Sequence, residues 1–160
     1  KKLATTILLS NWAVTISESY TLNGVDYGNT MNKTYIDNGQ VSQRVMSISP
    51  KTVGEETNYF TTILSLNTLD AKGQVVKEDY KYFRITNLDD ANTLNLRFFN
   101  GSEYVAVTVL PSSSFLLMDN GIDAPATSTV QLTFSDITEI VGQSSSSTES
   151  LDIEFVMVTS

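Results

Sequence analysis

The chain has 160 residues, enough for one domain with a hydrophobic core. Its charged fraction is low, at 18%, and Ser, Thr and Asn are correspondingly frequent, as is typical of a β protein. It contains no cysteine and no histidine, which excludes disulfides, thiolate nucleophiles, Cys- or His-ligated metals and histidine-dependent hydrolytic mechanisms. The formal net charge is −8 and the few Lys and Arg are scattered, so we expect no nucleic-acid surface.

The N-terminal segment, residues 1–10, begins with Lys1-Lys2 and an apolar run. It has some features of a secretory signal, but threonines interrupt the run and Ser10-Asn11 end it. We therefore expect a first strand or an extended N-terminal arm here. No later stretch is long and apolar enough to span a bilayer, so no membrane partner is expected.

Apolar residues then alternate at Trp12, Val14 and Ile16, and again at Tyr20 and Leu22, which predicts a strand pair or one long bent strand. Four Asn-Gly pairs punctuate the chain, and Asn and Gly both tolerate the positive φ of a tight type I′ hairpin turn. The pairs begin at Asn23, Asn38, Asn100 and Asn120.

Further strands are predicted at residues 30–36, 41–48, 59–66 and 75–86, with Tyr80, Tyr82 and Arg84 sharing one side of the last. Residues 94–98 and 105–109 alternate on either side of Asn100-Gly101 and predict a hairpin.

Beyond Pro111, short strands are predicted at residues 115–118 and 130–134, and a final strand at 151–157 with Asp152 and Glu154 facing outward. The polar tract 143–150 is expected to be an exposed, mobile connector, or else a loop tip that meets a partner. About ten strands and no substantial helix predict one all-β domain over residues 1–160, an antiparallel β-sandwich or jelly roll.

A glycosidase mechanism uses two carboxylates and is the one hydrolytic mechanism that needs no histidine. Three carboxylate pairs are candidates for it. They are Glu55-Glu56, Glu78-Asp79 and Asp89-Asp90. Neighbours on a strand point to opposite faces, so solubility and turn formation explain these residues better. We predict no catalytic residue and no enzyme activity.

Asp119, Asn120 and Asp123 offer oxygen ligands for calcium, but their spacing does not match the known calcium loop, and Asx residues beside Gly suit an ordinary turn. No metal site and no cofactor are therefore predicted. The aromatic residues, Trp12 and the tyrosines at 20, 27, 35, 59, 80 and 82, would suit a sugar platform but follow no pattern. The glycosylation triplets at Asn32 and Asn100 are interpreted as accidental.

The stretch 83–90, the hairpin that follows, Pro111 and the strand at 115–118 form a pattern that resembles small β-sandwich structural proteins of tailed bacteriophages, which end in a strand like residues 151–155. The resemblance covers roughly residues 80–160. It implies a virion component: a capsid decoration or cement protein, or a part of the neck, tail or fibre, with major capsid or tail proteins as partners.

Low surface charge and hydroxyl-bearing strands suit a protein that assembles in many copies, and we expect a homo-oligomer in the virion. The alternative is a bacterial extracellular or cell-surface module that binds a glycan or a protein. Exposed tyrosines with calcium nearby would favour the alternative, whereas buried tyrosines and an extended terminal arm would favour the virion protein.

Overall fold

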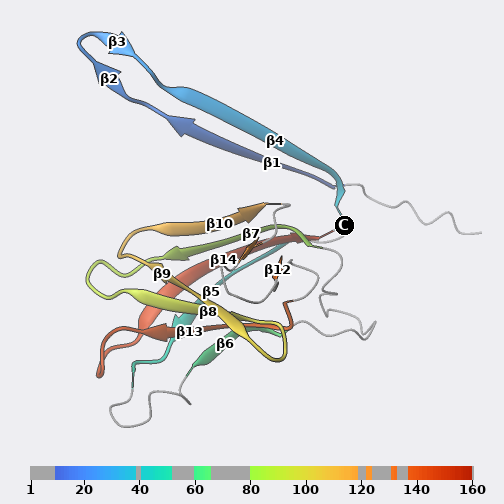
Figure 1. Ribbon diagram of the computed structural model, residues 1–160, viewed down its shortest axis with the longest axis vertical. Coiled ribbons are helices and arrows are strands. Elements are labelled where there is room, and N and C mark those ends of the chain that lie inside the picture. Colours follow the sequence, from blue (N-terminus) through green and yellow to red (C-terminus); the bar gives the residue numbers. More distant parts are fainter. Residues whose placement is uncertain are drawn as a thin grey trace, which may run out of the picture.

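The computed structural model describes residues 10–38, 41–51, 60–65, 80–118, 122–123, 131–132 and 137–159. These residues form an all-β structure in which two four-stranded antiparallel sheets make a β-sandwich (Figure 1). Sheet I has the strand order β10 (Ser114–Met118), β7 (Tyr80–Asn87), β14 (Leu151–Thr159), β5 (Val41–Ile48). Sheet II has the order β6 (Thr61–Ser65), β13 (Glu139–Ser144), β8 (Leu94–Phe99), β9 (Tyr104–Val109).

The core lies between the inner faces of the two sheets. In β8 the alternation is strict, with Leu94, Leu96 and Phe98 fully buried, because successive side chains of a strand point to opposite faces. The Phe83 ring of β7 meets the Phe98 ring edge-on across the sandwich at 6.1 Å and the Phe155 ring of β14 at 5.3 Å. Edge-to-face contacts of this kind favour a defined packing of the core.

Residues 10–38 form a separate feature, which we call the hairpin arm. Its strands β1 (Ser10–Glu18) and β4 (Asn29–Asn38) pair with each other, and β2 (Thr21–Leu22) pairs with β3 (Val25–Asp26). In the described part of the chain none of them joins either sheet. Figure 1 shows the arm running away from the sandwich, with β2 and β3 at its far end.

The base of the arm packs on the outer face of sheet I. Trp12 and Tyr35, opposite each other in the arm, contact Tyr82 of β7 with ring separations of 6.0 and 6.3 Å. Val156 and Val158 of β14 complete this second, smaller apolar cluster. The arm is therefore held by side-chain packing at one end.

The structure confirms the all-β sandwich and most of the predicted strands. The hairpin pairs Leu94 with Val109 and Phe98 with Val105, as the alternation predicts. At the tip of the arm Asn23 and Gly24 both have positive φ, 52° and 78°, so this pair makes the predicted tight turn. The predicted strand at 130–134 is described only as β12 (Gln131–Leu132), which pairs with β11 (Ile122–Asp123).

Two predictions are wrong. The tract 143–150 is not wholly an exposed connector, because Gln143 and Ser144 belong to β13, pair with Asn95 and Leu94 of β8, and are buried. The Asn100-Gly101 pair is not a two-residue turn, because the loop between β8 and β9 has four residues. There the Asn100 side-chain oxygen accepts hydrogen bonds from the N–H groups of Ser102 and Glu103, so the side chain shapes the wider loop.

Candidate functional site

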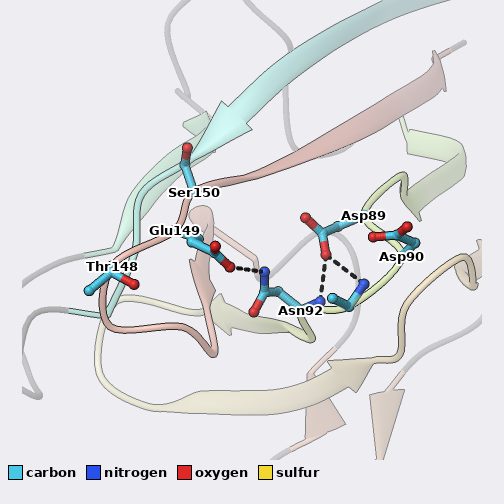
Figure 2. Close-up of a pocket in the computed structure, with 7 residues that line it drawn as sticks. Asp89, Asp90, Asn92, Thr148, Glu149 and Ser150 are labelled. Carbon is cyan, nitrogen blue, oxygen red and sulfur yellow. Dashed lines mark hydrogen bonds between the residues drawn. The ribbon is translucent and has the colours of Figure 1, made fainter.

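One open hollow of about 540 Å³ is lined by the turn after β7 and by the segment before β14 (Figure 2). Three carboxylates line it, Asp89, Asp90 and Glu149. Asn92 joins the two segments, because its side-chain amide donates a hydrogen bond to Glu149 Oε2 at 3.1 Å. The hollow is thus acidic, and polar side chains from two separate segments form its walls.

Asn87, at the end of β7, holds the turn that follows in place through hydrogen bonds of its side chain. It is fully buried, its Nδ2 donates to the carbonyl of Asn92 at 2.9 Å, and its Oδ1 accepts from the N–H of Asp89 at 3.1 Å. Asp89 in turn accepts hydrogen bonds from the N–H groups of Asn92 and Ala91. The sequence reasoning did not single out Asn87, and only its position at the end of a strand before Leu88-Asp89 could have signalled this role.

Backbone hydrogen bonds from Asn92 and Ala91 hold the pKa of Asp89 below its ordinary value. A glycosidase needs one carboxyl whose pKa is raised so that it can donate a proton. Asp89 has the opposite shift, and its hydrogen bonds are those of a turn-forming aspartate. Among the described residues no group of three or more His, Cys, Asp or Glu is arranged to hold a metal ion.

The remaining sequence candidates are dispersed. Asp89-Asp90 lies in a turn and not on a strand, so the argument from strand alternation does not apply to this pair. Asp123 lies in β11, and Asn32 lies in β4, where its side-chain oxygen accepts a hydrogen bond from Thr15 Oγ1 at 2.8 Å. Outside the described residues lie Glu55, Glu56, Glu78, Asp79, Asp119, Asn120 and residues 1–9.

The tyrosines whose side chains the structure describes fall into two groups, and the side chains of Tyr59 and Tyr80 lie outside the described set. Tyr35 and Tyr82 are buried where the arm meets sheet I. Tyr20 and Tyr27 are exposed at the far end of the arm, where their rings lie 6.2 Å apart, and Tyr104 is exposed on β9. The buried tyrosines are therefore core residues, whereas the exposed ones are accessible to a binding partner.

The far end of the arm, residues 20–27, which we call the arm tip, exposes four large apolar side chains. Their exposed fractions are 58% for Tyr20, 48% for Leu22, 52% for Val25 and 61% for Tyr27. Further down the arm Met31 is 44% exposed opposite Ile16. An apolar group of this kind at the end of a projecting element is a candidate contact surface.

The other side of the arm is a row of small polar side chains. Thr15 bonds Asn32, and the hydroxyl oxygens of Ser17 and Thr30 lie 3.1 Å apart across the two strands. These cross-strand hydrogen bonds stabilise the pairing of β1 with β4 where no sandwich strand supports it. The arm can thus keep its shape while its tip stays exposed.

Among the described residues there is no helix with the length and apolar character needed to cross a bilayer. No protein-family model matches the chain, and comparisons with curated protein sequences and with solved structures also find no significant match.

Proposed function

We propose that the protein is a non-enzymatic structural protein of a bacteriophage virion, in the first place a capsid decoration protein that stabilises the particle through protein contacts. A component of the neck, tail or fibre would act through the same kind of protein contact at another position in the particle. The observation that carries it is the arm tip, where Tyr20, Leu22, Val25 and Tyr27 lie exposed on a projecting hairpin.

The paired strands of the arm make it a preorganised binding element. A β-hairpin that already has its bound shape loses little conformational entropy on docking, so burial of its tip contributes more of its free energy to affinity. Tyrosines are common among the residues that dominate protein interfaces. The resemblance of residues 80–160 to phage β-sandwich proteins is the reason to place the protein in a virion. The arm tip is the surface through which we expect it to bind there.

The second candidate is a bacterial surface module that binds a glycan or a protein. The tilted pair of exposed rings, Tyr20 and Tyr27 at 6.2 Å, favours this candidate, because exposed aromatic faces stack on sugar rings. Binding of the purified protein on a glycan array, lost in Tyr20→Ala and Tyr27→Ala and retained in Leu110→Ala, would support this candidate over the first.

The test of the first candidate begins with virions purified from the phage that encodes the chain. Mass spectrometry should find the protein in particles in a fixed ratio to the major capsid or tail protein. Particles prepared without it should take up the purified protein, and a Leu22→Ser/Tyr27→Ser variant should bind at least tenfold more weakly. Absence of the chain from the particles would contradict the proposal.

A matched control variant removes the same number of exposed apolar side chains from another part of the molecule. Val45→Ser/Leu110→Ser changes two residues that are 65% and 60% exposed but lie on the sandwich. We expect this variant to bind particles like the unmodified protein. Equal loss in both variants would show that general surface hydrophobicity, not the arm, drives binding.

A further inference from the structure

The turn at the far end of the arm holds an Asn-Gly pair with a side-chain amide that no other group binds. Asn23 and Gly24 are exposed, and the Asn23 side chain makes no hydrogen bond within the described part of the chain. No atom lies within 4 Å of the position that a Cβ on Gly24 would occupy. The Asn23 amide and the Gly24 N–H therefore lie next to each other in open surroundings, at the end of a projecting hairpin (Figure 1).

This pair has a reaction open to it that needs only water. The Gly24 nitrogen attacks Cγ of Asn23, a C–N bond forms, and the side-chain nitrogen takes up the Gly24 N–H proton and leaves as ammonia. The product is a five-membered succinimide ring. Water then opens the ring at Cγ to give aspartate, or at the main-chain carbonyl to give isoaspartate. Asparagine is thermolabile for this reason, and a glycine nitrogen is the least shielded because glycine has no Cβ.

The pair Asn100-Gly101 supplies an internal comparison, because the same two residue types stand in a different environment. The Asn100 side-chain oxygen accepts hydrogen bonds from the N–H groups of Ser102 at 3.0 Å and Glu103 at 2.7 Å, and the residue is half-buried. Gly101 resembles Gly24, since both have positive φ and open space at the Cβ position. The two pairs therefore differ in the asparagine and not in the glycine.

The two hydrogen bonds of Asn100 oppose the ring closure. The Cγ atom must turn towards the glycine nitrogen before it can be attacked, and at Asn100 this movement breaks contacts that the loop depends on. At Asn23 it breaks no hydrogen bond within the described residues. The other two Asn-Gly pairs include Gly39 and Asn120-Gly121, which lie outside the described residues.

We propose that Asn23 is a self-modification site, at which conversion to aspartate and isoaspartate inactivates the arm tip as the protein ages. The inference concerns the regulation of the arm tip, and it rests on the proposed function for its consequence but not for the reaction itself.

Both products disturb the contact surface of the tip. Leu22 and Val25 pair directly across the turn and are exposed, so a carboxylate at position 23 stands beside the apolar side chains that dock. That charge must lose its water when the tip is buried, which opposes binding. Isoaspartate also adds one carbon atom to the main chain, and a two-residue turn matches the twist of its strands only at its normal length.

The reaction is tested on the full chain, incubated at mildly alkaline pH and analysed by peptide mapping with mass spectrometry. In the folded protein Asn23 should be converted at least about tenfold faster than Asn100. In concentrated urea the difference should largely disappear, because only the fold separates two identical residue pairs. Equal rates in the folded protein, or the same difference in urea, would overturn the assignment of the site.

The consequence is tested with the particle-binding assay. Aged protein should bind at least about tenfold more weakly than fresh protein, and fresh Asn23→Asp should show a similar loss. Asn23→Gly is the matched control, since a Gly-Gly pair also forms this tight turn and has no side-chain amide. It should bind equally well before and after the incubation.

The outcomes separate this inference from the proposed function. If aged protein binds like fresh protein while Leu22→Ser/Tyr27→Ser does not bind, the tip is the contact surface and inactivation at Asn23 is refuted. If fresh protein binds particles without any need for the tip, or does not bind them, the proposed function and the inactivation fail together. The two conversion rates then decide alone whether Asn23 is a modification site.

Discussion

Gly142 in β13 is a position where one added methyl group tests the packing of the core. It lies in the buried middle of sheet II, and a Cβ atom there would lie 3.0 Å from Ile63 Cδ1, 3.1 Å from Leu94 Cδ1 and 3.4 Å from Ile48 Cδ1. Carbon atoms pack best at about 3.5–4.0 Å, so Ile63 and Leu94 must each move by several tenths of an ångström.

Two opposing effects set the magnitude for Gly142→Ala. Alanine in a strand gains about 0.5–1 kcal/mol over glycine because the unfolded chain has less freedom to lose. Overpacking of a core that has no room costs about 1–3 kcal/mol. We expect a net loss of about 1 kcal/mol, which lowers the Tm by about 2–4 °C in a domain of this size.

Urea and thermal unfolding would measure this loss, and Ile63→Val supplies the internal check. Ile63→Val alone should cost about 0.5–1.5 kcal/mol because it removes the buried Cδ1. In combination with Gly142→Ala it should cost at least about 0.5 kcal/mol less than the sum, since the contacting atom is gone. Strict additivity would refute the reasoning. Gly101→Ala is the control, because no atom lies within 4 Å of its Cβ position and only its φ of +97° opposes the change.

Three further predictions concern the arm, the acidic turn and the core. Tyr82→Ala should release the base of the arm and shift the fluorescence emission of Trp12, the single tryptophan, to longer wavelength, while the far-UV circular dichroism of the sandwich is retained. An unchanged emission would show that the arm does not depend on this contact. The lowered pKa of Asp89 means that its ionised form stabilises the fold above its unfolded pKa, and that this stability is lost as the pH falls through the folded pKa, so Asp89→Ala should be less stable at pH 7 and show a flatter acid limb in urea midpoints. Phe83→Ala should cost about 3–5 kcal/mol in the same unfolding assay, and a loss below 1 kcal/mol would contradict the burial of its ring.

The hairpin of β8 and β9 could be predicted from the sequence because its signal is local. Leu94, Leu96 and Phe98 alternate with polar residues and are buried, and the valines of β9 alternate likewise on the side that faces the core. Strand β13 lacked this signal. Gly142 and Ser144 occupy its inner face, where Ile63 and Ile48 of other strands fill the space beside Gly142, so the apolar residues that mark the position are distant in sequence.

The arm could not be separated from the sandwich by sequence alone. Trp12, Val14 and Ile16 alternate like any core strand, but only Trp12 and Val14 pack against the sandwich cluster. Periodicity shows which side chains share a face and does not show what covers that face. A groove lined by Lys51, Phe60 and Arg97 was missed for a similar reason, since Arg97 lies in β8, far in sequence from the other two residues.

The central place of β14 in sheet I has a consequence for the order of events during synthesis. This strand pairs with β5 on one side and with β7 on the other, so residues 151–159 close a gap between segments made much earlier. Until the ribosome has added them, β5 and β7 each expose an unpaired edge, and unpaired edges favour aggregation. The strand pairing of the arm lies within residues 10–38 and can form first, whereas the packing of its base on sheet I and the closure of the sandwich must wait for β14.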